Sequence, residues 1–243
     1  MKRTLLGYVQ TTLSMMDSDE VDSINVTTES LQVATLARDV YLEFVTRKTW
    51  DFLKRPISLV GGGNPAEPTR LDTPSALQEV HSLKYNISED GEYRGRELKY
   101  MTPEDFLRIH ASPVDDAVLV DLGSVRFYVR SDRMPMHWTS FDDDAIYLDA
   151  FDSAIETTST SERVSCLASI IPEFSITDEF VPDLPERYIP MYQASLNAYA
   201  MNVLKQSASP SDNSMAMRQL ASIQRQESRY TKREYYNNRY GRR

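Results

Sequence analysis

The sequence has few of the residues that form covalent cross-links and metal sites. Its 243 residues include one cysteine and three histidines. A single cysteine excludes an internal disulfide and a zinc site built from several cysteines. Cys166 lies in an apolar run, where we expect a buried and unreactive thiol. His81, His110 and His137 lack the short spacing of metal ligands, so we expect ordinary histidines, no bound metal and no cofactor.

Long apolar stretches are also missing. No window reaches the roughly twenty consecutive apolar residues that a membrane-spanning helix needs. The residues after Met1-Lys2-Arg3 include four polar ones within positions 10–14, which is too polar for the apolar part of a secretion signal. We therefore expect a soluble protein that is made in a reducing cytoplasm and makes no membrane contact.

Motifs of enzymes are equally scarce. There is no Gly-x-Ser-x-Gly nucleophile motif. The glycines at 61–63 are followed by Asn-Pro instead of the Lys-Ser/Thr of a phosphate-binding loop, so they predict a mobile surface loop. A Ser/His/Asp triad assembled from distant positions remains open, but no motif marks one. We therefore expect a protein that is not an enzyme.

What the sequence does have is charge of opposite sign in different regions. The whole chain has a formal net charge of −9. Residues 211–243 contain eight Lys and Arg against three acidic residues, a net charge of +5, so residues 1–210 carry −14. Residues 230–243 are basic and rich in tyrosine, and they hold too few aliphatic side chains for a core of their own. We expect this tail to bind another molecule.

A second region is strongly acidic. Residues 142–186 contain twelve Asp and Glu against a single base, Arg163, a net charge of −11. The densest part consists of Asp142, Asp143, Asp144, Asp149 and Asp152. We interpret this region as a solvated acidic surface or as the lining of a channel. Carboxylates can hold a divalent cation, but the glycine-punctuated pattern of a calcium-binding loop is missing, so we predict no metal site.

The spacing of apolar residues predicts helices at both ends of the chain. The first covers about 3–16, and the second begins at a cap at Thr27 or Thr28 and continues to about residue 48. A third follows residue 182, and a polar, narrowly striped fourth begins near Asn213. The stripe of the third helix consists of Tyr192, Leu196, Tyr199 and Val203.

The middle of the chain contains short alternating or β-branched segments that are typical of strands. They are expected at residues 80–87, 93–100, 117–122, 125–130, 145–148 and 164–171. Turn residues at 89–91 and 122–124 predict that the first four strands form two antiparallel hairpins. Between these hairpins, a short helix is expected over 102–110, with Thr102 as its cap and Pro103 at its first position.

Together these elements predict an α+β fold. We expect an antiparallel helical bundle formed by residues 1–50 and 183–229 and an inserted antiparallel β-rich domain over 51–182. Residues 230–243 are expected to form an extended, basic aromatic C-terminal arm.

Three short motifs resemble the head-to-tail adaptor proteins (tail tubular, or gatekeeper-like) of short-tailed bacteriophages. A paired helical N-terminus leads into Arg-Lys-Thr-Trp-Asp-Phe at 47–52, similar to the helix-then-Trp-x-Phe junction of that family. Leu-Pro-Glu-Arg-Tyr-Ile at 184–189, followed by an Ala- and Tyr-rich helix, resembles the start of the family's third main helix. A charged last helix then ends in an Arg- and Tyr-rich tail.

The resemblance implies a structural virion protein, made in the host cytoplasm and located at the head-to-tail junction. About twelve copies would form a closed ring between the portal protein and the tail or nozzle protein, with passing DNA in a central channel. The acidic residues could line that channel and keep DNA from adhering. The C-terminal arm would dock into the portal, since Arg pairs with carboxylates and Tyr supplies rigid contact area. The implied portal contacts are Tyr230, Lys232, Arg233, Tyr235, Tyr236, Arg239, Tyr240, Arg242 and Arg243.

Two other functions remain open. The protein could be a nucleic-acid-binding regulator, because Arg and Tyr in the tail can neutralise phosphates and stack on bases. The negative charge of residues 1–210 opposes this function. The third is an enzyme whose carboxylates within 142–152 bind a metal ion.

Overall fold

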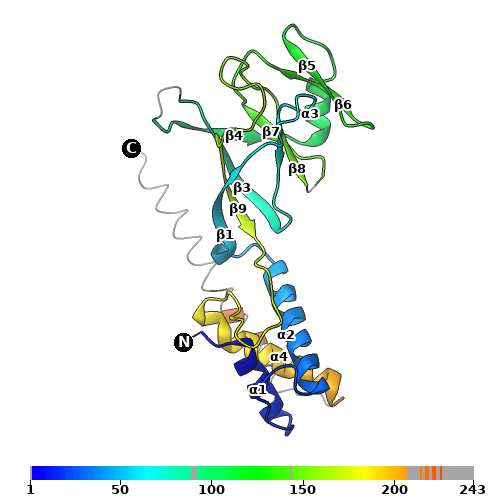
Figure 1. The fold of residues 1–243 in the computed structure, drawn as a ribbon, viewed down its shortest axis with the longest axis vertical. Coiled ribbons are helices and arrows are strands. Elements are labelled where there is room, and N and C mark those ends of the chain that lie inside the picture. The colour runs from blue at the N-terminus through cyan, green and yellow to red at the C-terminus, as the bar shows by residue number, and fades with distance from the viewer. Residues whose placement is uncertain are drawn as a thin grey trace. The chain divides into compact units, whose positions relative to one another are not determined.

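The chain has a mixed α+β fold made of two units (Figure 1). The computed structural model describes residues 2–88, 92–142 and 144–206. Beyond these it describes Ser214, Met217, Arg218, Ala221, Ser222 and Arg225, all of them helical. Unit 1 comprises Met1–Lys48 and Glu173–Arg243, and unit 2 comprises Thr49–Pro172.

Unit 1 is helical, and its first two helices begin after threonine caps, Thr4 and Thr27. α1 covers Leu5–Met15, α2 covers Thr28–Thr46, and α4 covers Ile189–Leu204 after a short 3-10 turn, η2, at Glu186–Tyr188. Thr27 caps α2, and its hydroxyl accepts a hydrogen bond from the amide of Ser30 at 3.0 Å. The Ser30 hydroxyl lies 3.2 Å from the amide of Thr27, which completes a capping box.

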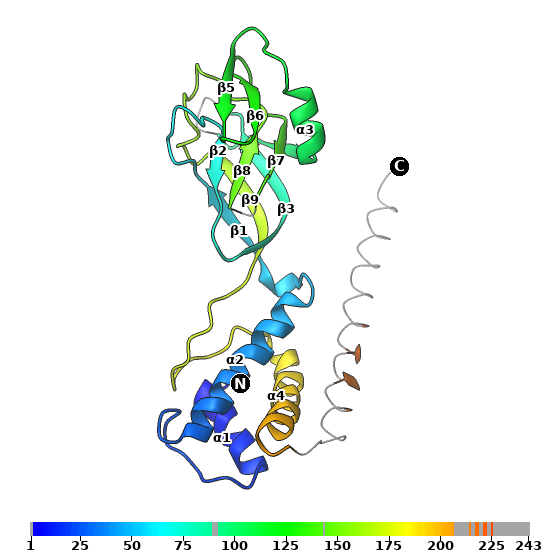
Figure 2. The same ribbon diagram turned by 90° about the vertical axis from the view of Figure 1, so that its right-hand side faces the viewer.

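The core of unit 1 is formed by aromatic rings where α1, α2 and α4 pack against one another (Figure 2). The ring of Tyr192 meets that of Tyr8 edge to face, with centroids 5.1 Å apart. The Tyr192 hydroxyl donates to the carbonyl of Ala37 in α2 at 2.7 Å. Burial raises the pKa of Tyr192, so this hydroxyl stays protonated as the donor that links α4 to α2.

The predicted stripe of α4 is only half buried. Tyr192 and Leu196 are 0% exposed, as expected, whereas Tyr199 is 45% and Val203 is 49% exposed. Met191 and three alanines, Ala194, Ala198 and Ala200, supply the rest of the buried face. The second half of α4 therefore turns an apolar side to the surface.

Residues 173–182 belong to unit 1, although the sequence analysis assigns them to the β-rich segment. The amides of Leu5 and Leu6 donate to the carbonyls of Phe180 and Asp178 at 2.6 and 3.3 Å. The Asp178 carboxylate also accepts from the amide of Ile24 at 2.8 Å. The bonds from Leu5 and Leu6 use amide groups that the first turn of α1 leaves free, and together with the bond from Ile24 they fix the returning chain on the helical unit.

Unit 2 contains a seven-stranded sheet and a separate hairpin. The order in the sheet is β1 (Lys54–Leu59), β9 (Val164–Ile170), β3 (Leu77–Asn86), β4 (Gly95–Tyr100), β7 (His137–Thr139), β8 (Ala145–Leu148) and β2 (Arg70–Asp72). The hairpin pairs β5 (Ala117–Asp121) with β6 (Arg126–Arg130). The remaining elements are a 3-10 turn, η1 (Asp51–Leu53), and helix α3 (Pro103–Ile109).

Both predicted hairpins are confirmed, because β3–β4 and β5–β6 pair antiparallel, and so is the short helix capped by Thr102. The prediction of an entirely antiparallel sheet is wrong at one place. β4 pairs with β7 in parallel, through Lys99 with His137 and Tyr100 with Trp138. Strands β1, β2 and β7 have no counterpart among the predicted strands, since two of them are three residues long and β1 carries Lys, Arg and Pro.

Two hydrophobic cores meet at β8, which is buried along its whole length. Ile146 and Leu148 pack into the core of the large sheet, among residues of β3, β4 and β9. Ala145 and Tyr147 face the opposite way, into a core formed with Phe106 of α3 and with the β5–β6 hairpin. The alternating directions of side chains along a strand therefore let one short apolar strand serve both cores.

The loop at 61–68 forms no helix or strand, as predicted, but it is anchored at Gly61. The Gly61 amide donates to the carbonyl of Ser159 at 2.6 Å. A β-carbon at this position would lie 2.5 Å from the Arg70 carbonyl oxygen and 2.9 Å from the Ser159 carbonyl oxygen. Only glycine allows the backbones to approach this closely.

Replacing Gly61 with Ala should lower the free energy of unfolding of unit 2 by about 1–3 kcal/mol, because backbone atoms would have to move. Urea unfolding followed by circular dichroism measures the change. Gly62→Ala is the matched control. Its β-carbon would meet only the end of the Asp72 side chain at 3.3 Å, so its effect should stay below about 0.5 kcal/mol. Equal stability of the two variants would contradict the conclusion that the close backbone approach requires glycine at position 61.

Candidate interaction surfaces

The nine residues with the strongest predicted role lie outside the described residues. They are Tyr230, Lys232, Arg233, Tyr235, Tyr236, Arg239, Tyr240, Arg242 and Arg243. Their assignment to portal contact stays a prediction from the sequence.

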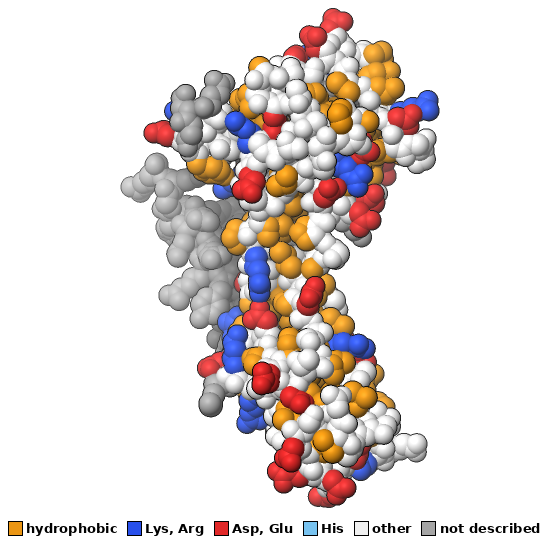
Figure 3. Space-filling view, in the orientation of Figure 1, with side chains coloured by type: hydrophobic (Ala, Val, Ile, Leu, Met, Phe, Trp, Pro, Cys, Tyr) orange, Lys and Arg blue, Asp and Glu red, His pale blue; other side chains and the backbone are white. Residues whose placement is uncertain are grey.

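The acidic stretch at 142–186 is divided between the two units. Its residues up to 172 belong to unit 2, and those from Glu173 onward belong to unit 1. On the face of unit 2 in Figure 3, Asp and Glu side chains are interspersed with Lys and Arg side chains. A run of acidic residues in the sequence therefore does not translate directly into one acidic face.

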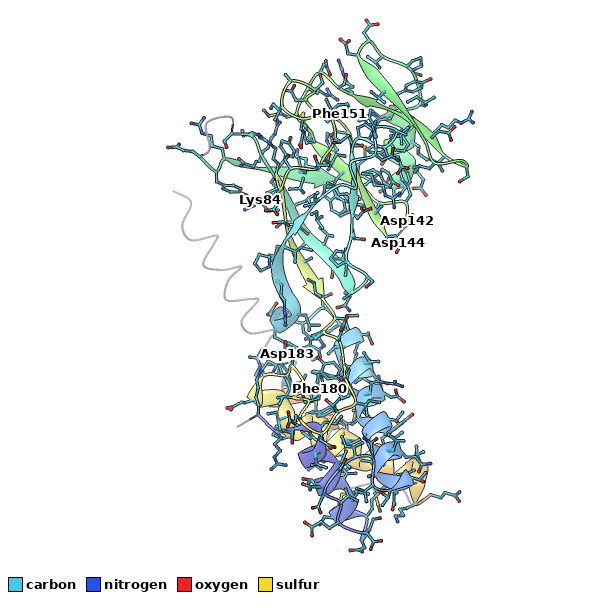
Figure 4. All side chains as sticks on the ribbon, viewed as in Figure 1. Lys84, Asp142, Asp144, Phe151, Phe180 and Asp183 are labelled. Carbon is cyan, nitrogen blue, oxygen red and sulfur yellow. The ribbon has the colours of Figure 1, made fainter. Side chains whose placement is uncertain are left out.

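The predicted acidic residues themselves occupy different environments. Asp142 and Asp144 are exposed and lie side by side in the loop before β8 (Figure 4). The Asp142 carboxylate accepts from the amides of Asp144 and Ala145, at 3.2 and 3.0 Å. Asp152, which is half-buried, accepts from the amide of Ala154 at 2.9 Å. Both carboxylates thus close local turns. Asp143 lies outside the described residues.

Asp149 corrects the expectation of an exposed acidic zone, because its side chain is buried at 2% exposure. One carboxylate oxygen accepts from the amides of Met136 and His137, at 2.8 and 2.9 Å. The other lies 3.1 Å from Nδ1 of His137. Two amide donors and the imidazole ring of one segment surround the carboxylate, so Asp149 holds the start of β7 against the end of β8.

Each histidine and the cysteine has its own local contacts. Within the described ranges, no three His, Cys, Asp or Glu side chains are grouped as a metal ion would require. His81 lies 2.7 Å from the hydroxyl of Ser169, and His110 is buried beside Phe106, with ring centroids 4.5 Å apart. Cys166 is buried as predicted, and burial raises the pKa of its thiol to about 11, which keeps the sulfur protonated and unreactive.

Unit 2 carries a groove of about 780 Å³ between β3 and the β4–β7 pair. Its floor is apolar and includes Leu83, Leu98 and Ile146. Glu79, His81, Glu97 and Lys99 supply charged or titratable groups around it. At one end the rings of Tyr100 and Trp138 meet edge to face with centroids 4.9 Å apart, and Tyr100 is 57% exposed. We refer to this feature as the β3 groove.

Two irregularities in β3 help to shape the β3 groove. The register with β9 shifts between Leu77 and Glu79 and again between Val80 and Ser82. Gln78 and His81 are therefore extra residues without a direct partner in β9, and both line the groove. Extra residues of this kind redirect side chains and are frequent beside binding sites.

The β3 groove is the feature that the sequence analysis missed. Only its residue types are visible in the sequence. The register shifts depend on how β3 pairs with β9, a strand far along the chain. No pattern in the sequence around β3 predicts that pairing.

Unit 1 exposes an apolar patch where α2 and the end of α4 meet. A groove of about 300 Å³ there is lined by Thr28, Leu31, Gln32, Thr35, Leu36, Val203 and Leu204. Leu31 is 43% and Val203 is 49% exposed. We call it the α2–α4 patch. Apolar side chains gathered in one groove are typical of a surface that another protein covers.

Comparison with known proteins adds no relationship, since no family model and no curated protein matches the sequence. Within the described ranges, no helix is both long and apolar enough to span a bilayer.

His110 should make the stability of unit 2 depend on pH. Burial lowers the pKa of His110, which outweighs the raising effects of the Asp149 carboxylate and the Tyr128 carbonyl. The unfolded chain therefore binds a proton more readily than the folded one. Stability should fall as the pH drops through the ordinary pKa of histidine, about 6.5, and this loss should be smaller in His110→Asn.

Urea unfolding at pH 8 and pH 5 measures this difference. Gly62→Ala, which changes no titratable group, serves as the control and should keep the pH dependence of the parent protein. A pH dependence unchanged in His110→Asn would show that other groups cause it.

Proposed function

We propose that the protein is a structural virion component, the subunit of an adaptor ring that connects the portal to the tail or nozzle of a short-tailed bacteriophage. In this proposal the helices of unit 1 form an antiparallel bundle, unit 2 is the inserted domain, and residues 230–243 form the arm that docks into the portal. About twelve subunits surround a channel for DNA.

The observation that carries the proposal is the basic, tyrosine-rich chain end attached to a helical unit built from both ends of the chain. Residues 211–243 carry +5 on a chain whose total is −9. Arg and Tyr are the residues that most often dominate protein interfaces, and a segment with few aliphatic residues gains order by binding a partner. A cleft in the portal would supply that partner.

The α2–α4 patch supports the ring. Leu31 and Val203 are exposed, and they line one groove with the half-buried Leu36 and Leu204, an arrangement that costs free energy in water. In a ring, each subunit buries one surface against a different surface of its neighbour, so an exposed apolar groove on every copy would be covered.

The positive charge of the tail also favours a second function, binding to nucleic acid. Lys and Arg in residues 230–243 could neutralise phosphates while Tyr rings stack on bases. The charge of −14 on residues 1–210 opposes a duplex or a single strand that approaches the rest of the chain. We therefore favour a protein cleft as the site that receives the tail.

Changing Tyr235, Tyr236 and Tyr240 together to Ala should weaken docking to the portal ring of the encoding virus by about tenfold or more, because rigid aromatic contact area is lost. Neutralising Arg239, Arg242 and Arg243 to Gln should weaken docking no more than this. Co-sedimentation of the full chain with purified portal rings measures both, and deletion of 230–243 should abolish docking.

Binding to free duplex and single-stranded DNA at several salt concentrations separates the two functions. If the full chain does not co-sediment with portal rings but binds free DNA with an affinity that falls with added salt and with the loss of Arg239, Arg242 and Arg243, nucleic acid is the partner and the adaptor proposal is wrong.

The ring itself has an independent test. Leu31→Asp places a charge in the α2–α4 patch and should reduce the number of subunits assembled on a portal, since a carboxylate would be desolvated at the subunit contact. Light scattering after size exclusion gives the mass of the assembly. Val26→Asp is the control, because Val26 is 63% exposed and does not line the patch. Full assembly of the Leu31→Asp variant would show that the α2–α4 patch is not a contact between subunits.

A further inference from the structure

Part of β3 has a strand on one side only. Residues Leu83–Asn86 pair with β4 on one side and, together with the rest of β3, with β9 on the other. Within the described part of the chain, Leu77–Ser82 pair with β9 alone. The opposite edge of this segment therefore presents backbone N–H and C=O groups that no strand uses.

The missing neighbour results from a change of partner in β4. After Leu98 the strand leaves β3 and pairs in parallel with β7, through Lys99 and Tyr100. The sheet opens between β3 and the β4–β7 pair, and the β3 groove occupies the opening. Its length follows Leu77–Leu83, the segment that contains the free edge.

We propose that the β3 groove binds an extended peptide segment of a partner protein, which adds to the free edge of Leu77–Ser82 as a further strand. In this mode the backbone of the peptide forms hydrogen bonds with the strand edge, and pockets for alternate side chains select the sequence. The groove meets both needs, because an apolar floor lies beside a strand edge that no strand of the described residues pairs with.

The side chains around the groove indicate the chemistry of the peptide. Glu79 and Glu97 outnumber Lys99, and Glu79 is held by the hydroxyl of Thr49 at 2.5 Å. Residues 49–172 contain 21 acidic and 12 basic residues, so unit 2 as a whole carries −9. A peptide with basic residues is therefore favoured, since charge of opposite sign accelerates and orients docking.

One position of the peptide should be aromatic or aliphatic. The exposed face of Tyr100, supported by the ring of Trp138, offers a flat apolar contact at the end of the groove. Gln78 adds a polar group whose side-chain oxygen is buried and, among the described residues, has no hydrogen-bond partner. An amide or ammonium group of the peptide would donate a hydrogen bond to this Gln78 oxygen. We therefore expect basic residues to alternate with aliphatic or aromatic ones.

The peptide site lies in unit 2, and its binding does not depend on the docking of residues 230–243 or on a ring. A protein that binds the portal through its tail could lack this site, and a nucleic-acid-binding protein could have it.

Tryptophan fluorescence of the full chain can report binding. Trp50 is 0% exposed and outside the groove, whereas Trp138 lines it. The probe is an acetylated, amidated Lys-Val-Lys-Tyr-Lys-Val peptide. We expect a saturable change in emission. The same peptide methylated on alternate backbone nitrogens should bind at least tenfold more weakly, because one edge of its hydrogen-bond ladder is blocked. A Glu-Val-Glu-Tyr-Glu-Val peptide should bind at least tenfold more weakly through charge.

Two pairs of variants localise the site. Tyr100→Ala should weaken binding by about tenfold, whereas Tyr93→Ala, which removes a tyrosine that is 63% exposed outside the groove, should not. Glu97→Lys should weaken binding, whereas Asp115→Lys, at an exposed loop position of the same unit, should leave it unchanged. Circular dichroism confirms that each variant is folded.

The proposal is overturned if the methylated peptide binds as tightly as the parent, or if Tyr93→Ala and Tyr100→Ala behave alike. A fluorescence change with maltohexaose and none with any peptide would make the groove a carbohydrate site instead, and it would equally overturn the proposal.

Discussion

The antiparallel pairing of β1 with β9 is the interaction on which the rest of the fold depends. Lys54 lies opposite Ser169 and Leu59 opposite Val164, so the two ends of unit 2 are joined side by side. Closing so long a loop costs conformational entropy, which the apolar face of β9 offsets by burying Cys166 and Ala168 in the core of the sheet. Because the chain leaves unit 2 beside the place where it begins, residues 1–48 and those after 173 can belong to one helical unit.

The strand β9 also determines the structure in the middle of the sheet, where it pairs with β3. β9 pairs with β3 over its full length, and the two register shifts in β3 follow from that pairing. β4 can follow β3 only as far as Leu98 before it joins β7. β7 pairs with the buried strand β8, and Trp138 of β7 packs against the core of the large sheet on one side of the opening. An opening between packed strands, beside a strand edge that no described strand covers, is a suitable place for a peptide to bind.

Acidic side chains in the described part of the chain contribute to the fold through individual hydrogen bonds. Several acidic side chains of the acidic stretch at 142–186 have local structural tasks: Asp142 closes a turn, Asp149 accepts from the amides of Met136 and His137, and Asp178 accepts from the amide of Ile24. In the proposed function, recognition therefore belongs to the tail and to the apolar surface of unit 1.

The sequence by itself determined the elements whose signals are local. The two hairpins and the capped helix α3 follow from turn residues and caps a few positions apart, and the buried face of α2 follows from helical periodicity. It also determined the charge of the tail and the buried state of Cys166. Only the tertiary structure decided that β1 is a strand, that β4 and β7 run parallel, that Tyr199 and Val203 are exposed, and that Asp149 is buried. The physical reason is that each of these depends on a partner far away in the chain. An edge strand with Lys, Arg and Pro has no strand signal of its own, and a helix stripe or a carboxylate is buried only where a neighbouring element covers it.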